Sequence, residues 1–223
     1  MDVFDIFFPK KCLECGRFGK YICNNCFSKT EQAFAICPGC GNPSRDGLRH
    51  SYCKYKTPLN RLILIWKYSG VVRKALIGLK FKLAFSIAEE LANRAVTQLQ
   101  TIQLADSLLV PIPLHPRRQN WRGFNQAEEI GKIIASKMNW VFEPKLLKRI
   151  IDTPHQIGLN KKQRLENISE AFVLKHKDPS LITRNPSLIL FDDVYTTGST
   201  MKEAAKVLKK AGFDNIVGLA VAS

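Results

Sequence analysis

Residues 188–200, LILFDDVYTTGST, constrain the fold of this chain more than any other stretch of its sequence. The continuous apolar run Leu188 to Phe191 is typical of a strand covered on both faces of a parallel sheet. Asp192 and Asp193 follow where we expect that strand to end, and ligands of open α/β sheets lie at the carboxyl ends of strands. A helix is expected from about Met201, and a hydroxyl-rich loop precedes it: Thr196, Thr197, Gly198, Ser199 and Thr200.

This arrangement fits a ligand that carries both a sugar diol and a phosphate. The diol would face the two carboxylates, and the N–H groups at a helix N-terminus attract phosphate. An ordinary strand–turn–helix with a capping box at Thr200–Glu203 is the alternative, but it needs neither an acidic pair nor four hydroxyls. The stretch resembles the phosphoribosyl pyrophosphate (PRPP) signature of type I phosphoribosyltransferases.

All seven cysteines precede residue 54, which favours metal ligands over disulfides. Three Cys-x2-Cys knuckles and one His-x2-Cys pair make eight ligands, the number for two tetrahedral zinc sites. The predicted ligands are Cys12, Cys15, Cys23, Cys26, Cys37, Cys40, His50 and Cys53. Full ligation leaves no open position for water, so these zinc ions are expected to be structural.

We predict a double zinc ribbon over residues 1–56 and an α/β domain over residues 57–223. The ribbon segment is too short for a substantial core, so metal would supply most of its folding free energy. Sequential and interleaved pairing of the knuckles both stay open. His50 is either a ligand or an exposed loop histidine.

The net charge is +15, from 34 basic and 19 acidic residues. Such an excess favours polyanionic partners such as nucleic acid, nucleotides or phosphorylated sugars, although a generally basic proteome is an alternative explanation. No signal peptide or apolar run of membrane-spanning length is visible, so we expect a cytoplasmic protein without membrane insertion.

Residues 61–82 carry basic side chains, without an acidic one, among the aromatics Trp66, Tyr68 and Phe81. Basic and aromatic side chains together can follow a nucleic-acid backbone and stack on its bases. The alternative is a basic helix face whose aromatics belong to the core. The candidate DNA-binding residues are Arg61, Lys67, Arg73, Lys74, Lys80 and Lys82.

A second buried strand is predicted over residues 108–114, followed by a cationic loop with His115, Arg117 and Arg118. Arginine forks bind phosphate oxygens in pairs, so this loop is our candidate for the pyrophosphate of the same ligand. A solvated basic loop is the alternative. A helix over residues 127–138 follows, and the irregular polar region around Gln156, Arg164 and Asn167 is a candidate lid. A last helix–strand unit ends the chain, as in a parallel sheet.

Several of these segments occur in one order that resembles the ComF (ComFC) family of competence-related proteins across nearly the whole chain. They are the cysteine knuckles, Val110 to Arg118, Arg122 to Gln126, Gln156 with Arg164 and Asn167, Ala171-Phe172, and the Asp-Asp loop. The resemblance implies a double zinc ribbon joined to a type I phosphoribosyltransferase domain, in which helices flank a parallel sheet. One position departs from the family pattern, since His50 stands where a cysteine is usual.

The resemblance also implies function. It implies PRPP with Mg²⁺ as ligand, structural zinc, and the handling of incoming single-stranded DNA during natural transformation, with other DNA-uptake proteins as candidate partners. Asp192 and Asp193 would face the ribose hydroxyls, and residues 196–200 would hold the 5-phosphate. Whether PRPP is only bound or is consumed stays open; the alternative is an active phosphoribosyltransferase of nucleobase or nucleotide metabolism, whose acceptor no residue identifies.

Overall fold

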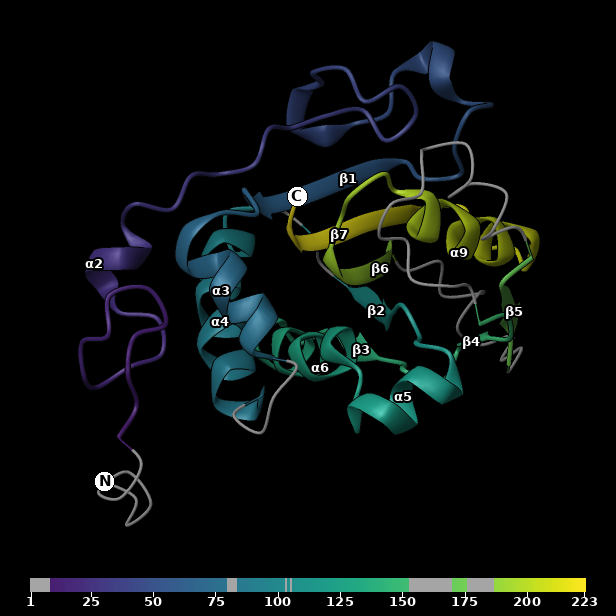
Figure 1. The fold of residues 1–223 in the computed structure, drawn as a ribbon. Coiled ribbons are helices and arrows are strands. Elements are labelled where there is room, and N and C mark those ends of the chain that lie inside the picture. The colour runs from purple at the N-terminus through teal and green to yellow at the C-terminus, as the bar shows by residue number, and fades with distance from the viewer. Residues whose placement is uncertain (1–8, 80–83, 103, 105, 153–169, 176–186) are drawn as a thin grey trace.

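A five-stranded parallel sheet forms the centre of the protein, in the strand order β1-β7-β6-β2-β3 (Figure 1). The structure is a computed structural model that describes residues 9–79, 84–102, 104, 106–152, 170–175 and 187–223. The strands are β1 (Arg61–Trp66), β2 (Ser107–Pro111), β3 (Val141–Phe142), β6 (Ser187–Val194) and β7 (Ile216–Ala222). A separate antiparallel hairpin joins β4 (Leu147–Arg149) to β5 (Phe172–Leu174). The predicted α/β fold with a parallel sheet is confirmed.

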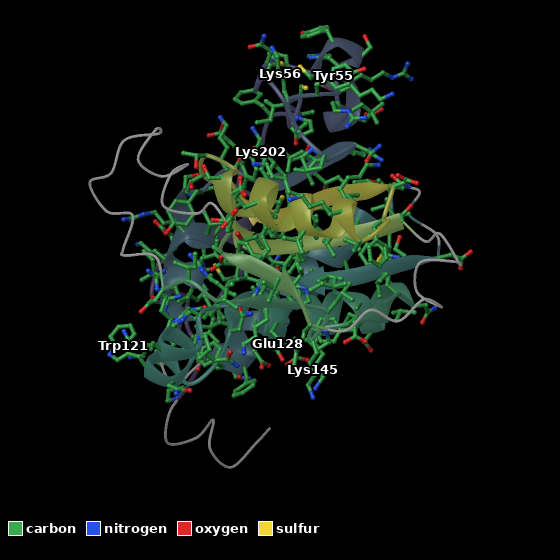
Figure 2. The ribbon with its side chains drawn as sticks, turned by 90° about the vertical axis from the view of Figure 1, so that its right-hand side faces the viewer. Tyr55, Lys56, Trp121, Glu128, Lys145 and Lys202 are labelled. Carbon is green, nitrogen blue, oxygen red and sulfur yellow. The ribbon has the colours of Figure 1, made fainter. Side chains whose placement is uncertain are left out.

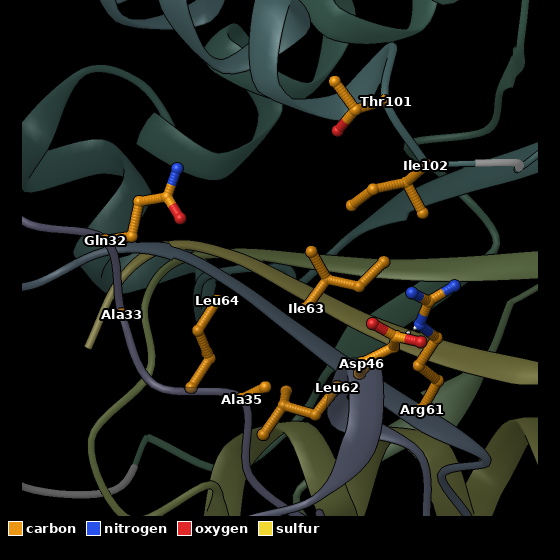
Figure 3. A pocket seen from close by; sticks show the side chains of 10 residues that line it. All are labelled: Gln32, Ala33, Ala35, Asp46, Arg61, Leu62, Ile63, Leu64, Thr101 and Ile102. Atoms are coloured by element: carbon orange, nitrogen blue, oxygen red, sulfur yellow. Dashed lines mark hydrogen bonds between the residues drawn. The ribbon is translucent and has the colours of Figure 1, made fainter.

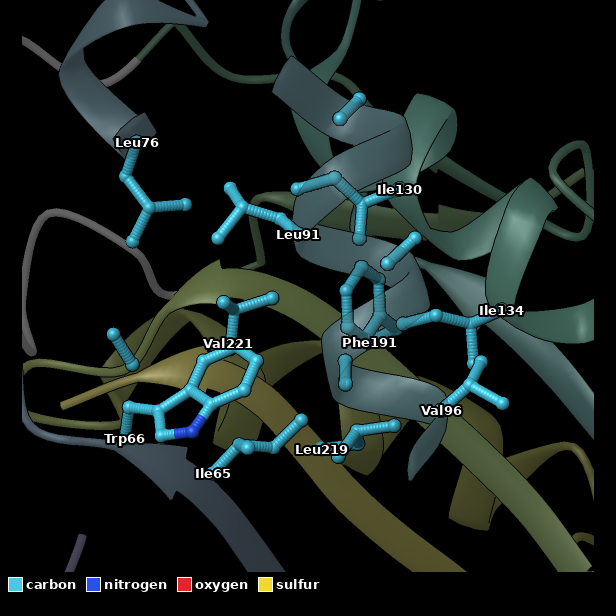
Figure 4. Close-up of a cluster of buried hydrophobic side chains, with 14 of the residues drawn as sticks. Ile65, Trp66, Leu76, Leu91, Val96, Ile130, Ile134, Phe191, Leu219 and Val221 are labelled. Carbon is cyan, nitrogen blue, oxygen red and sulfur yellow. The ribbon is translucent and has the colours of Figure 1, made fainter. Parts of the chain in front are cut away.

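Helices cover both faces of the sheet. Helices α3 (Gly70–Gly78), α4 (Ala84–Leu99) and α6 (Gln126–Met138) lie on one face, and α9 (Ser199–Lys210) lies on the other with the β4–β5 hairpin (Figure 1). Alternate residues of β6 point to opposite faces, so Ile189 and Phe191 join the first core while Leu188 and Leu190 join the second. Figure 4 shows the first core, where the Phe191 ring lies among side chains of α4 and α6.

Strand β6 extends further than expected. It continues through the acidic pair to Val194, because Asp192 and Val194 stay in register with Ala220 and Ala222 of β7. The expected end at Phe191 was therefore wrong by three residues. Helix α9 also begins earlier than predicted, at Ser199, since Gly198 takes the left-handed conformation that opens the helix. Because β6 ends later and α9 begins earlier than expected, the loop between them is short and spans residues 195–198.

A helix replaces the predicted cationic loop. Residues Pro116–Arg122 form α5, with His115 as its N-cap. Proline at the first helical position is pre-organised for a helix, and Gly123, with φ 82°, ends it. Asn125 then caps α6 by accepting a hydrogen bond from the backbone N–H of Ala127 at 3.1 Å.

The N-terminal module has two lobes that contact different parts of the α/β domain (Figure 1). The first lobe, with α2 (Asn24–Phe27), is held by Glu90, whose carboxylate accepts hydrogen bonds from the backbone N–H groups of Tyr21 and Ile22. The second lobe, with η1 (Arg45–Gly47) and η2 (Ser51–Cys53), packs on β1. Gly47 approaches β1 so closely that an added Cβ would lie 1.9 Å from the Leu62 carbonyl oxygen. Within the described ranges, no helix is both long and apolar enough to cross a membrane.

Candidate functional site

The two acidic side chains lie at the carboxyl end of the central strand β6. The Asp192 carboxylate accepts a hydrogen bond from the backbone N–H of Asp193, and the Asp193 carboxylate accepts one from Val194, both at 2.9 Å. Burial raises the pKa of Asp192 well above its usual value, and the neighbouring Asp193 charge raises it further. The pair is therefore short of positive charge, which a cation or the hydroxyl protons of a ligand would supply.

The hydroxyl-rich loop leads directly from this pair into helix α9. Thr196 is exposed, while the hydroxyls of Thr197 and Ser199 lie 2.9 Å apart. Gly198 has φ 72°, and an added Cβ would lie 2.2 Å from the Tyr195 hydroxyl oxygen. Only glycine fits this position, and it directs the N–H groups of the first turn of α9 toward the end of the sheet.

A cavity of about 630 Å³ opens beside the loop. Asp193, Val194, Tyr195 and Thr196 line one part of it. The rest of the lining comes from distant parts of the chain: Ile36, Tyr68, Arg122 and Ser223. The cavity thus lies among Asp193 of the acidic pair, the N-terminal module, helix α5 and Ser223.

Arg149 is a site residue that sequence reasoning missed. It is only 6% exposed, its guanidinium lies 5.6 Å from the Phe172 ring centroid, and its Nε donates to the Ile151 carbonyl at 3.4 Å. Burial and the charge of Arg118 lower the pKa of Arg149, whereas Asp192 and Asp152 oppose that shift. Arg149 therefore interacts electrostatically with Asp192 of the acidic pair and with Arg118 of α5. Strand alternation at 147–149, with Leu147 and Arg149 buried on either side of an exposed residue, was the available signal.

Helix α5 joins this charge network at Asp152. The Asp152 carboxylate lies 3.8 Å from His115 Nδ1 and 3.4 Å from Arg118 Nε, whereas Arg117 is exposed. The pyrophosphate candidates thus do not form one cluster, because only His115 and Arg118 share a partner near Arg149. Arg122, which was not assigned a role, lines the cavity and donates to Gln126 Oε1 at 3.4 Å.

Three of the candidate DNA-binding cations contact residues of the N-terminal module: Arg61, Lys67 and Lys74. Lys67 pairs with Glu31, Lys74 pairs with Glu14 at 3.2 Å, and Arg61 donates to the Asp46 carbonyl at 2.8 Å. Arg73 is exposed. Trp66 is buried at 2% exposure and packs edge-on to Phe27, so it is a core residue and offers no stacking surface. Lys80, Lys82 and Phe81 lie outside the described residues, as do Gln156, Arg164 and Asn167 of the candidate lid.

A second cavity of about 600 Å³ lies beside β1, the edge strand of the sheet (Figure 3). Its lining comes from residues 32–35, from Asp46 and from Thr101 and Ile102, besides β1 itself. Of the predicted site residues it contains Arg61 alone, whose guanidinium is held at Asp46. The acidic pair and its loop do not line this cavity, so the candidate sugar-phosphate site remains at the carboxyl ends of the strands.

The eight predicted metal ligands form two separate groups. Cys12, Cys15, Cys23 and Cys26 make the first, and Cys37, Cys40, His50 and Cys53 make the second, with all ligand atoms of a group within 4.8 Å of one another. The structure therefore selects sequential pairing over interleaved pairing. His50 belongs to its group and is not a detached loop histidine.

The distances fit tetrahedral zinc. Zinc bonds of about 2.3 Å to sulfur and 2.0–2.1 Å to nitrogen place two sulfurs roughly 3.8 Å apart, and sulfur and nitrogen roughly 3.5 Å apart. Cys15 Sγ and Cys23 Sγ are 3.8 Å apart, and Cys40 Sγ and His50 Nδ1 are 3.5 Å apart. Cys37 Sγ also accepts N–H groups from Gly39 and His50, at 3.3 and 3.4 Å, as a thiolate would. Both groups thus fit structural zinc.

Without a bound cation, the thiols of each group cannot all lose their protons together, because each negative charge disfavours the next. Burial and the neighbouring thiols of Cys15, Cys23 and Cys12 raise the pKa of Cys26 to about 12, and burial with Cys40 and Cys37 raises that of Cys53 to about 11. Hydrogen bonding, led by the Asn42 backbone, lowers the pKa of Cys40 to about 6. Bound zinc would relieve this conflict, because its charge favours all ligands in the deprotonated form.

Comparison with known proteins supports the zinc module first. Residues 3–55 match the model of a double zinc ribbon domain. This match agrees with the two ligand groups seen in the structure.

Curated relatives match nearly the whole chain. Competence protein F of Haemophilus influenzae is 29% identical over 94% of this chain and 95% of its own length. The DNA utilization protein YhgH of Escherichia coli K12 is 29% identical over 90% of this chain and 88% of its own. Competence protein ComFC of Bacillus subtilis is 28% identical over 86% and 79%. The resemblance of this chain to the ComF family, with its N-terminal double zinc ribbon, is therefore confirmed.

Proposed function

We propose that this protein binds PRPP with Mg²⁺ at the carboxyl end of β6. The observation that carries the proposal is the acidic pair at the end of a central parallel strand, followed by a hydroxyl-rich loop whose left-handed Gly198 opens α9. The ribose hydroxyls would face Asp192 and Asp193, and the 5-phosphate would accept N–H groups of residues 196–200. The residues present fit Mg²⁺, because carboxylates are the oxygen ligands that it prefers.

Arg149 gives this site a fixed positive charge. The residue is buried, and the charges of Asp192 and Asp152 favour its protonated form. A guanidinium there offsets the repulsion between the two carboxylates and can pair with phosphate oxygens of a bound ligand. His115 and Arg118, joined to the same network through Asp152, would form its outer part toward the pyrophosphate.

Replacing Arg149 by Met should weaken PRPP binding by about tenfold to a hundredfold, because a charge-assisted hydrogen bond contributes about 1.5–3 kcal/mol. Isothermal calorimetry with PRPP and Mg²⁺ measures this change. Arg117→Met is the matched control, since Arg117 is exposed on α5 and should leave the affinity within about twofold. Equal losses in both variants would reject the role assigned to Arg149.

A binding protein and an enzyme differ in what happens to PRPP. Transfer requires departure of pyrophosphate from the anomeric carbon, which Mg²⁺ and arginines can assist without a protein nucleophile. We therefore test pyrophosphate release from PRPP with nucleobases and with single-stranded DNA. PRPP that binds but is never consumed rejects the enzyme alternative, and acceptor-dependent release supports it.

We further infer that the protein acts on single-stranded DNA in DNA uptake or utilization. The relatives are named for competence and for DNA utilization, and these names support this role. The net charge of +15 supports it as well. Exposed aromatic rings offer stacking surfaces: Tyr55 is 96% exposed on the N-terminal module, and Trp121 is 80% exposed on α5, four residues after Arg117 (Figure 2).

Neutralising the described part of the 61–82 set should weaken binding to a single-stranded oligonucleotide and flatten its dependence on salt. The variant carries Gln in place of Arg61, Lys67, Arg73 and Lys74. Its matched control loses four exposed lysines elsewhere, so that both net charges fall from +15 to +11: Lys132, Lys137, Lys209 and Lys210. Fluorescence anisotropy over a salt series compares them. If the two variants lose the same affinity, the effect is one of overall charge and the assigned surface is rejected.

A further inference from the structure

The second group of zinc ligands lies close to the hydroxyl-rich loop of residues 196–200, because the residue before Cys37 shares a core and a cavity with the start of that loop. Ile36, which directly precedes the ligand Cys37, packs into the second core together with Tyr195. Ile36, Tyr195 and Thr196 also line the same cavity as Asp193. Figure 1 shows the second lobe above β1 and close to the start of α9, which agrees with these contacts.

The knuckle itself fixes Ile36. Residues 36 and 43 form an antiparallel bridge, and the backbone N–H of Cys37 donates to Asn42 at 2.8 Å. Gly39 in the same knuckle faces Cys53, since an added Cβ would lie 2.6 Å from the Cys53 Cβ. Zinc joins these segments through Cys37, Cys40, His50 and Cys53. Loss of the metal would release the loop that carries Ile36.

Tyr195 connects the core that contacts Ile36 to the hydroxyl-rich loop. It is 9% exposed, and its backbone N–H donates to Ala222 at 2.8 Å, so its main chain is fixed by β7. Its ring and hydroxyl fill the space where a Cβ of Gly198 would stand, at 2.2–2.6 Å. Tyr195 therefore belongs to the core against which Ile36 of the second lobe packs, and its ring lies close to Gly198 of the loop.

We propose that the second zinc centre is a structural part of the PRPP site, with Tyr195 as the positioning residue between them. The first zinc centre has no such role, because its lobe is held at Glu90 and Arg94 of α4 instead. This inference rests on the proposed PRPP binding. Linkage makes the effect reciprocal: zinc in the second site raises PRPP affinity, and bound PRPP raises the zinc affinity of that site by the same factor.

Two cysteine variants test the proposal in the full-length protein. Cys40→Ser removes a ligand of the second site, and Cys15→Ser is the matched control in the first site. Each should contain one zinc per chain instead of two. We expect PRPP affinity, measured with Mg²⁺ by calorimetry, to fall at least fivefold in Cys40→Ser and to stay within twofold in Cys15→Ser. Unchanged affinity in Cys40→Ser, with one zinc lost, overturns the proposal.

A third variant tests the Ile36 side chain while it leaves all the zinc ligands in place. Ile36→Ala should keep both zinc ions yet lower PRPP affinity, because it shortens a side chain that packs against the core containing Tyr195 and lines the cavity beside Thr196. Full affinity in Ile36→Ala overturns the assigned route. Amide exchange at residues 196–200 distinguishes this inference from the proposed function. If wild-type protein does not bind PRPP, the proposed function fails, while faster exchange in Cys40→Ser than in Cys15→Ser still supports the coupling and equal exchange rejects it.

Discussion

Replacing Asp192 and Asp193 together by Asn should lower PRPP affinity by at least about a hundredfold, because a site built to pair with ligand hydroxyls and a cation loses both charges. Zinc content and the fold should be unchanged, since Asn keeps the side-chain oxygens that accept from the backbone of Asp193 and Val194. Calorimetry gives the affinity, and circular dichroism and zinc analysis give the controls. Wild-type affinity in the double variant would remove this loop from the binding site.

The same substitution has a second, opposite effect on stability. Burial and Asp193 raise the folded-state pKa of Asp192 above its unfolded value of about 3.9, so the folded protein binds a proton more tightly than the unfolded chain does. As pH rises from the unfolded pKa through the folded pKa, the ligand-free wild type therefore loses stability.

The ligand-free Asn variant lacks this loss, and we expect its melting temperature to exceed that of the wild type above the folded pKa, by an amount that shrinks on acidification. A gain of about 1 kcal/mol corresponds to roughly 2–4 °C for a chain of this size. Melting curves over a pH series measure it. A difference that grows toward acid would contradict the assigned shift. Function and stability thus make opposite demands on this residue.

Removal of zinc should have the largest structural effect, because a structural zinc contributes apparent binding energies of about 10–16 kcal/mol in small ribbons. We expect two zinc ions per chain and, after chelation, rapid proteolysis within residues 9–56. The α/β domain should resist, since its two cores are built on the sheet from residues such as Phe191 and Leu190. Metal analysis and limited proteolysis with mass spectrometry measure both. Unchanged protection after complete chelation would show that the module does not depend on metal.

His50 provides the matched pair of variants for the metal test. His50→Cys restores the ligand usual in the family and should keep two zinc ions, whereas His50→Ala should lose or weaken one. Both variants remove the stacking of His50 on Tyr52. A difference in zinc content between them therefore reports on the ligand atom at position 50. Two tightly held zinc ions in His50→Ala would exclude His50 as a ligand, despite its Nδ1 lying 3.5 Å from Cys40 Sγ.

Local patterns predicted well where neighbours in sequence are neighbours in space. Strand, loop and helix at residues 187–210 are consecutive, so their order was readable, and only the boundaries shifted when pairing with β7 prolonged β6 to Val194. The paired cysteines were equally readable, because each knuckle is a local turn. The interpretation of residues 61–82 as one basic surface was less informative, because the stretch divides into β1, which buries Trp66, and helix α3.

The sequence alone thus determined the parallel α/β fold, the zinc ligands and the residues of the acidic pair and its loop, since each depends on residue type at short, regular spacing. Only the tertiary structure decided the pairing of the zinc knuckles, the electrostatic interaction of buried Arg149 with Asp192 and the packing of Ile36 against the core that contains Tyr195. The last two join residues more than forty and more than one hundred and fifty positions apart. Such contacts depend on how elements pack around the sheet, and no local spacing encodes them. The loop at 196–200 is therefore a local motif, whereas the cavity beside it is lined by residues as distant in sequence as Ile36 and Ser223.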